Sequence, residues 1–242
     1  KDGTFRATLT SDKTKVSKYP EAKDKLLAMY DQRDPRMQAT VILPYTWYKG
    51  WVNNARKDCE YVVGPTGAAN EKNGMIRINQ NYETYVYRKF VAEYDMNGAI
   101  NNRADTPINF PIIRYADVLL MLAECDNELG KLDDAVALIN KVRSRVGMPG
   151  INSGATWLEA RTKDAVFSRI RHERTVELAG EGLSYSDLRR WGLLMSLNGK
   201  GESGFTGTKT YYTRTVQDRD YLWPIPGVEI DKNSALTQNP GW

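Results

Sequence analysis

The sequence predicts a mainly α-helical domain with long irregular loop insertions, and three observations support this fold class. Apolar residues recur at helical spacing between residues 107 and 197, which we take as the helical core. Residues 37–106 lack sustained helical periodicity and contain Gly- and Asn-rich turns. Residues 208–242 carry prolines that favour an extended tail. We therefore expect one domain over residues 1–242.

The first predicted elements precede the helical core. Residues 19–32 have apolar side chains at helical spacing, and this helix should end before Pro35, because the residue preceding a proline is pushed out of the α region. Two short runs, Thr40–Leu43 and Tyr85–Tyr87, have strand-like composition. The rest of this region reads as loops, which are the usual carriers of functional residues.

Two helices joined by a very short link should form the centre of the core. The first runs from Arg114 to a stop at Gly130, and it is so widely apolar that we expect it to be centrally buried. Its predicted inward face consists of Tyr115, Val118, Leu119, Leu122 and Leu129. The second helix ends near Val146. With small Ala123 and Ala135 at the crossing, the pair resembles a tetratricopeptide-type (TPR-type) hairpin, without a second copy about 34 residues away.

The remaining elements follow in order. A third helix is predicted over 162–179 and a short fourth over 187–197, separated by glycines. Residues 199–207 form a Gly-rich loop that lacks the lysine context of a phosphate-binding loop. The prolines of Leu222–Pro226 predict an extended strap lying on the core.

Composition excludes several classes of protein. The formal net charge of +4 is too small and too dispersed for a nucleic-acid-binding surface. No apolar run approaches the roughly 18 to 20 residues of a membrane span. Cys59 and Cys125 predict two free thiols, with a single bridge as the alternative. Because the chain begins at Lys1 without a leader, we expect a processed product or a piece of a longer protein.

Four ordered motifs carry a resemblance to a known family. The first two are Arg33–Arg36 and Asn109–Glu124. The third consists of Arg171–Gly182 and Asp187–Gly192, and the fourth of Leu222–Pro226 and Gln238–Gly241. In this order and spacing they resemble the C-terminal half of the SusD/RagB family over about residues 30–242. The chain departs from the family pattern at Ser184, Ser186, Ser234 and Trp242, which affects local packing.

The resemblance implies a SusD-like helical domain and a function. Members of the family are outer-membrane surface lipoproteins that bind glycans and cover a TonB-dependent, SusC-like transporter. The resemblance implies no catalysis and no cofactor. It also implies that the lipid-carrying cysteine and further helical repeats lie in an N-terminal half, because Cys59 and Cys125 are in mid-chain and cannot be the anchor.

Three glutamates spaced four residues apart could place carboxylates on one helix face. Such carboxylates could be the acid and base of a glycosidase. However, Val166 and Ile170 share this face, and buried carboxylates need partners, so we expect structural ion pairs instead. The predicted network consists of Glu173, Arg174, Glu177, Glu181, Asp187, Arg189 and Arg190, with Arg171 as a further available cation.

Other candidate chemical groups favour structural roles. His172 is the only histidine, and no Ser-His-Asp or Cys-His arrangement or set of zinc ligands accompanies it. We therefore predict no catalytic residue and no metal site. Asp34-Pro35-Arg36 could be a functional loop, but a helix stop that hydrogen-bonds nearby backbone is the favoured interpretation.

An aromatic stretch followed by two amides is the candidate ligand-binding site. Flat rings can stack on the C–H face of a sugar, while amides bond its hydroxyl groups. The candidates are Trp47, Tyr48, Trp51, Asn53 and Asn54, with Tyr211 and Tyr212 as weaker ones. Burial of these rings in the core stays open as the alternative, because most aromatic residues of a domain are core residues.

These observations predict a binding protein without catalytic activity. The resemblance further implies that it binds oligosaccharide nutrients at the cell outer membrane and delivers them to a TonB-dependent transporter. A helical-repeat scaffold that binds only protein is the alternative, and it would expose an apolar patch on the hairpin over 114–146 while packing the rings of 45–51 away. A glycosidase ranks third.

Overall fold

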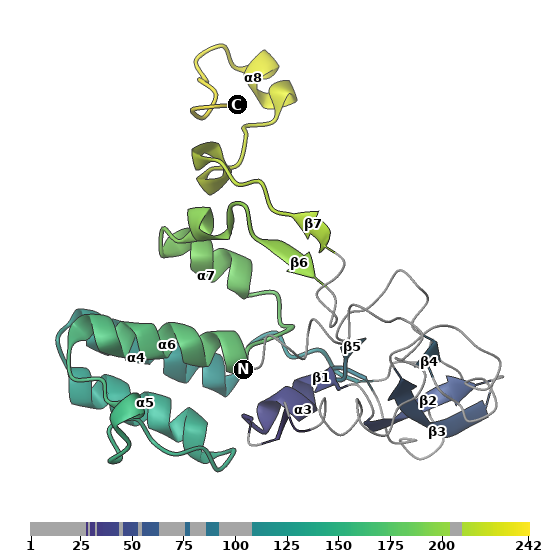
Figure 1. Ribbon diagram of the computed structural model, residues 1–242. Helices are drawn as coiled ribbons and strands as arrows, with labels where there is room; N and C mark the ends of the chain where they lie inside the picture. Colours follow the sequence, from purple (N-terminus) through teal and green to yellow (C-terminus); the bar gives the residue numbers. More distant parts are fainter. Residues whose placement is uncertain are drawn as a thin grey trace.

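The computed structural model describes residues 28, 30–31, 33–43, 46–52, 55–62, 76–77, 86–91, 108–203 and 210–242. A layer of three helices lies beside a region of small sheets, and the C-terminal segment rises away from the helices (Figure 1). The predicted helix-rich fold class is confirmed. The helix predicted over 19–32 falls largely outside the described residues.

The three-helix layer consists of α4 (Tyr115–Glu128), α5 (Leu132–Ser144) and α6 (Lys163–Glu177). The end of α4 is set by Gly130, whose φ of 77° lies in the left-handed region that favours glycine. There the amide of Lys131 donates to the carbonyl of Asp126, and that of Gly130 to Asn127, so that the last free carbonyls of the helix are bonded. At the start of α6, the Thr162 side chain accepts a hydrogen bond from the amide of Ala165.

The hydrophobic core lies between these three helices and the α5–α6 connection, which contains the short 3-10 helix η3 (Thr156–Leu158). Ala123 and Ala135 are fully buried, as expected for a close contact of α4 with α5. The TPR-type character of this hairpin stays a prediction. The core residues are Leu119, Leu120, Ala123, Ala135, Val136, Ile139, Val142, Ile151, Leu158, Ala160, Val166 and Ile170.

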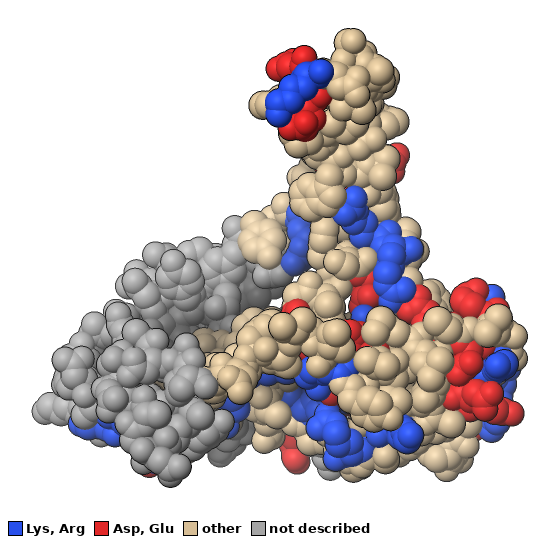
Figure 2. Space-filling view, turned by 180° about the vertical axis from the view of Figure 1, so that it is seen from behind, with Lys and Arg blue, Asp and Glu red and all other residues tan. Residues whose placement is uncertain are grey.

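The prediction that α4 is buried on all sides is wrong. Its buried side contains Leu119, Leu120 and Ala123, because α5 and α6 both pack there. The opposite side, here called the outward face of α4, exposes large apolar side chains, with 71% of Leu129 and 48% of Leu122 accessible. Its members are Tyr115, Val118, Met121, Leu122 and Leu129. Seen from behind, uncharged side chains cover much of the helical layer (Figure 2).

Three small sheets are described. After the short helix α3 (Arg36–Thr40), β1 (Val41–Ile42) pairs antiparallel with β5 (Val86–Tyr87), which confirms both predicted strand runs. A hairpin, β2 (Trp47–Val52) with β3 (Ala55–Val62), adds the parallel strand β4 (Ile76–Arg77). This hairpin was missed, because Lys49 and Gly50 interrupt the apolar alternation of β2. The third sheet pairs β6 (Gly201–Ser203) with β7 (Thr210–Thr213).

The C-terminal segment differs from its prediction in two ways. The predicted helix over 187–197 is α7 (Ser184–Arg190) followed by the 3-10 helix η4 (Leu194–Leu197), with Gly192 at φ 68° between them. The tail holds the short helices η5 (Asp218–Tyr221) and α8 (Gly227–Lys232) on either side of the extended prolines, and it projects from the helical layer instead of lying on it (Figure 1). Among the described helices, none is both long and apolar enough to cross a bilayer.

Candidate functional site

The β2–β3 hairpin presents one polar, solvent-exposed face. Trp47 and Lys49 share this face, because side chains alternate along a strand, and 56% of Trp47 is exposed. The Lys49 ammonium lies 2.5 Å from the carboxylate of Asp58, its partner on the neighbouring strand. An open indole therefore stands beside a solvated ion pair, which is a suitable surface for a ligand with both apolar and hydroxyl groups.

The other face of the hairpin is buried, and it includes Tyr48. Only 9% of Tyr48 is exposed, and it pairs across the strands with the buried Cys59. A Cβ atom on Gly50 would lie 2.8 Å from the Tyr48 ring, so the three residues pack closely. This burial contradicts the prediction that Tyr48 stacks on a ligand, because the strand alternation turns it away from Trp47.

The remaining predicted ligand-binding residues are described only in part. The backbone of Trp51 lies in β2 opposite Arg56, and its side chain lies outside the described residues. Asn53 and Asn54 lie entirely outside them, and so does the Tyr211 side chain. These residues stay predictions.

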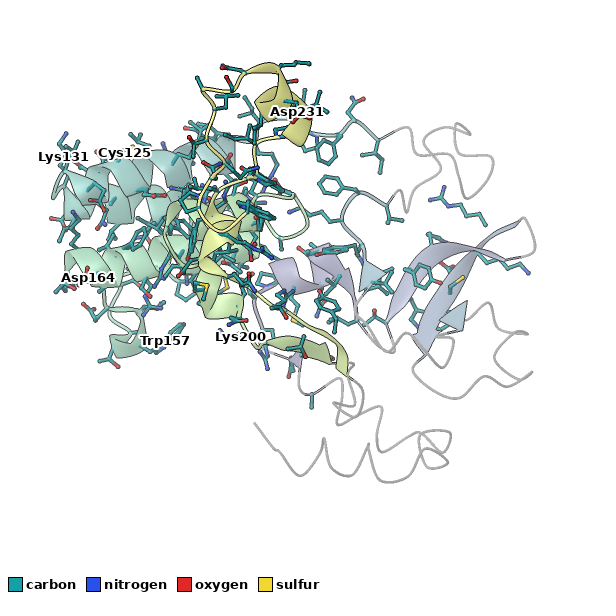
Figure 3. The ribbon with its side chains drawn as sticks, turned by 90° about the horizontal axis from the view of Figure 1, so that it is seen from above. Cys125, Lys131, Trp157, Asp164, Lys200 and Asp231 are labelled. Carbon is teal, nitrogen blue, oxygen red and sulfur yellow. The ribbon has the colours of Figure 1, made fainter. Side chains whose placement is uncertain are left out.

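Two other exposed rings lie away from Trp47 or are already in contact with a cation. Half of Tyr212 is exposed, but the Arg214 guanidinium lies 5.3 Å from its ring centre. Trp157 is 64% exposed and lies beside the helical layer, far from the β2–β3 hairpin (Figure 3). Trp157 therefore does not share a ligand-binding surface with Trp47, and the ring of Tyr212 is already in contact with a cation.

The carboxylate of Glu173 lies deep between two arginines. Only 1% of Glu173 is exposed. Its two oxygens accept hydrogen bonds from Arg36 at 2.6 Å and from Arg143 at 3.0 Å. Arg36 is also held by Asp34, which accepts from both its backbone amide and its guanidinium. The Arg33–Arg36 motif therefore does more than stop a helix: it supplies a buried cation to α6.

Glu177 and Glu181 meet a second group of cations at the end of α6. Glu177 accepts hydrogen bonds from Arg36, Arg114 and Arg145 at 2.8 to 3.0 Å. Glu181 accepts from Arg114 at 2.8 Å and from Lys89 at 2.5 Å. Burial alone would raise the pKa of each carboxyl, but these hydrogen bonds and charges outweigh it and lower both pKa values.

A third group of charges joins α4, α6 and α7. Arg174 pairs with Asp117 at 2.8 Å and with Asp187 at 2.7 Å. Arg190 pairs with Asp187 and contacts both oxygens of Glu124. Burial raises the pKa of Glu124, and hydrogen bonds from Arg190 and Trp191 lower it by more, so the net shift is downward.

The partners of these carboxylates differ from those expected. The arginines near Glu173, Glu177 and Glu181 in sequence do not reach them, because a helix turns such neighbours to other sides. Arg189 instead donates to the carbonyl of Tyr221 and stacks on Trp223. The cations come from distant segments: Arg36, Lys89, Arg114, Arg143 and Arg145. Of these, the sequence motifs contained Arg36 and Arg114, but spacing gave no sign of their partners.

This arrangement favours a structural role for the carboxylates. A glycosidase needs one carboxyl group that is protonated near neutral pH, so its pKa must be raised. Glu177 and Glu181 show the opposite shift, and both are bonded to cations. Within the described residues, no cluster of His, Cys, Asp or Glu could hold a metal ion, and Cys59 and Cys125 are free thiols.

Comparisons with known proteins agree on one family. Residues 3–242 match the sequence model of the SusD family. The SusD-like protein P2 of Formosa agariphila is 30% identical over 204 residues, which are 81% of this chain and 39% of that protein. A SusD-like protein from Bacteroides fragilis superposes with a TM-score of 0.65 at 25% identity, covering 89% of this chain and 40% of the other.

A second crystal structure from Bacteroides fragilis, described as a SusD-like carbohydrate-binding protein, has a TM-score of 0.54 at 26% identity. The match covers 86% of this chain and 42% of that one. The chain thus spans about two fifths of the length of these relatives.

Proposed function

Because this chain belongs to the SusD family, we propose that it binds an oligosaccharide and releases it chemically unchanged. The observation that carries this proposal is the exposed indole of Trp47 beside the ion pair of Lys49 and Asp58. An indole face supports the C–H side of a sugar ring, and the neighbouring polar groups can bond its hydroxyls. The similarity to a protein described as carbohydrate-binding supports the same ligand class.

The binding should be weak. Each sugar hydroxyl exchanges a hydrogen bond to water for one to protein, so the net gain is only about 0.5 to 1.5 kcal/mol per bond. A few such bonds and one or two stacked rings give a binding free energy on the order of −4 to −8 kcal/mol. This corresponds to a dissociation constant in the millimolar to micromolar range.

The cellular role follows from the family as a further part of the proposal. The chain would act at the cell outer membrane, as part of a surface-exposed lipoprotein, and pass its ligand to a TonB-dependent, SusC-like transporter. The ion-paired state of Glu173, Glu177 and Glu181 supports binding over hydrolysis.

Isothermal titration tests the binding proposal. We expect at least one member of a panel of soluble α-glucan, β-glucan, xylan and mannan oligosaccharides to bind. We expect Trp47→Ala to weaken this binding about two- to tenfold, since one stacked ring contributes roughly 0.5 to 1.5 kcal/mol. Trp157→Ala is the matched control, because it removes an exposed indole at the far end of the molecule. Equal binding by the Trp47→Ala variant would refute the site, and release of reducing sugar from the panel would refute the absence of catalysis.

A protein-binding scaffold is the second candidate, because the outward face of α4 is an exposed apolar stripe. Four of its residues, at positions 115, 118, 122 and 129, follow helical spacing, and exposed apolar patches of this kind mark interaction sites. The scaffold prediction also required Trp47 to be packed away, and its exposure disagrees with that part. If no glycan of the panel binds, the scaffold becomes the better proposal.

A further inference from the structure

We propose that the turn Arg88–Val91 positions Trp47 for its ligand by fastening the β2 strand to the end of α6. This inference rests on the proposed carbohydrate site, because the exposed Trp47 is the group that is positioned. The two cations at the start of the turn have different partners. Lys89 bonds to the helical layer, whereas Arg88 bonds to the backbone of Trp47.

Lys89 anchors the turn to the C-terminal end of α6. Its ammonium donates to the carbonyl oxygens of Glu177 at 3.0 Å and Ala179 at 3.1 Å, and to the carboxylate of Glu181 at 2.5 Å. Carbonyls at a helix end have no partner within the helix, and a cation there also interacts favourably with the helix dipole. Three acceptors around one ammonium hold Lys89 in a single place on α6.

A close contact beside Lys89 supports the same anchor. Gly180, just beyond α6, has a φ of 81°, and a Cβ atom there would lie 2.8 Å from the ring of Tyr87. The residue that precedes Arg88 therefore lies directly against the backbone that Lys89 bonds. The end of β5 and the end of α6 are packed together, as well as bonded.

Arg88 extends this anchor to the candidate site. Its Nη2 atom donates to the carbonyl oxygen of Trp47 at 2.8 Å. The backbone amides of Arg88 and Lys89 both donate to the carbonyl of Thr40, at 2.8 and 3.1 Å, which joins the turn to the end of α3. Arg36, at the other end of α3, is itself bonded to Glu173 and Glu177. Two separate connections therefore run from α6 to this turn.

The backbone of the turn is unusual at its third residue. Phe90 has a φ of 68°, in the left-handed region that bulky side chains rarely adopt. The turn is closed by a hydrogen bond from the Val91 amide to the Arg88 carbonyl, and the Phe90 ring packs 5.2 Å from that of Phe110. A residue held in an unfavourable backbone region needs such surrounding contacts, and these positions often serve a function.

A Trp47 that is already held in place improves binding, because less conformational entropy is lost when the ligand docks. Ordering a mobile side chain or loop on binding opposes affinity, and a preorganised ring avoids this loss. Lys89 and Arg88 are therefore positioning residues, which act through the backbone of Trp47 without contacting the sugar.

Hydrogen–deuterium exchange and titration of single variants test the proposal. We expect Lys89→Met and Arg88→Gln to speed amide exchange in β2 about tenfold and to weaken binding of the panel oligosaccharides about three- to tenfold. Lys89→Arg keeps a cation at this position, so its β2 exchange rate and its oligosaccharide affinity should stay close to those of the parent protein. Lys163→Met is the control. It removes a lysine at the start of α6, far from Lys89, that pairs with the exposed Glu128 of α4.

The pattern of exchange separates positioning from a merely structural role. If Lys89→Met leaves β2 exchange unchanged, or speeds it equally in β2 and in α4 to α6, the proposal is wrong. Faster exchange confined to β2, with no loss of oligosaccharide binding, also contradicts positioning of a ligand site. The proposed site fails separately, through unchanged binding by the Trp47→Ala variant.

Discussion

The outward face of α4 and the inward face of α6 reverse the usual distribution of residues. On α4, Leu129 and Tyr115 are about 70% exposed, whereas on α6 Glu173 and Glu177 are almost completely buried. The difference is one of partners: four arginines converge on these two α6 carboxylates, whereas the outward face of α4 stays exposed in the described structure. Periodicity locates a helix face, but only the neighbouring elements decide whether that face is inside.

The largest effect should come from removing one buried charge of α6. Glu173→Gln leaves Arg36 and Arg143 buried with weaker compensation, so we expect a loss of about 3 to 5 kcal/mol in the free energy of unfolding. Denaturant unfolding measures this change. Glu128→Gln is the control, because its exposed pair with Lys163 should contribute less than about 1 kcal/mol. Equal losses in both variants would show that burial does not distinguish the two pairs.

The two faces of α4 can be compared directly by truncating one leucine on each. Leu120 is fully buried, so Leu120→Ala should cost about 2 to 5 kcal/mol through lost contacts and a cavity. Leu122 is 48% exposed, and Leu122→Ala should change stability by less than about 1 kcal/mol. Thermal unfolding of both variants checks this difference. A large loss for Leu122→Ala would mean that the outward face is covered in the purified protein.

Asn127 lies on the buried side of α4, and its polar side chain has no hydrogen bonds to offset its burial. It is fully buried, and neither of its side-chain amide atoms has a hydrogen-bond partner in the described structure. Because an unsatisfied buried group costs about 1 to 3 kcal/mol, Asn127→Leu should raise stability by a similar amount. Asn140→Leu is the opposite control, since Asn140 bonds both the amide and the carbonyl of Ile151. A destabilised Asn127→Leu variant would indicate that the amide is satisfied in solution.

The smallest effect should be a gradual loss of stability in acid. Glu124, Glu177 and Glu181 have lowered pKa values in the folded state, so their contribution is complete above the ordinary Glu pKa of about 4.5. It is lost as the pH falls through the lower folded-state values. Exposed partners such as Arg145 weaken each pair by solvent screening. Urea unfolding between pH 7 and pH 3 measures this, and stability that rises below pH 4.5 would contradict it.

Much of the fold could be predicted from local sequence. Gly130 marked the end of α4, Thr162 the start of α6, and the runs around Val41 and Val86 were strands. The β2–β3 hairpin could not be predicted, because its strands are held by cross-strand pairing and not by a simple alternation of apolar residues. Of the predicted site residues, Trp47 is exposed and Tyr48, the next residue, is buried, and ligand binding at Trp47 stays a prediction.

The sequence by itself determined the family, the approximate ends of α4, α5 and α6, and the expectation that the α6 carboxylates are ion-paired. Those features depend on residues close to one another in the chain or on ordered motifs. The tertiary structure decided which cations meet Glu173, Glu177 and Glu181, which side of α4 faces solvent, and which ring of the aromatic stretch stays open. Each of these depends on contacts between segments up to 141 residues apart, as for Arg36 and Glu177. Local spacing cannot specify such contacts, because a helix or strand fixes only the direction of a side chain, and the packing of other elements fixes what it meets.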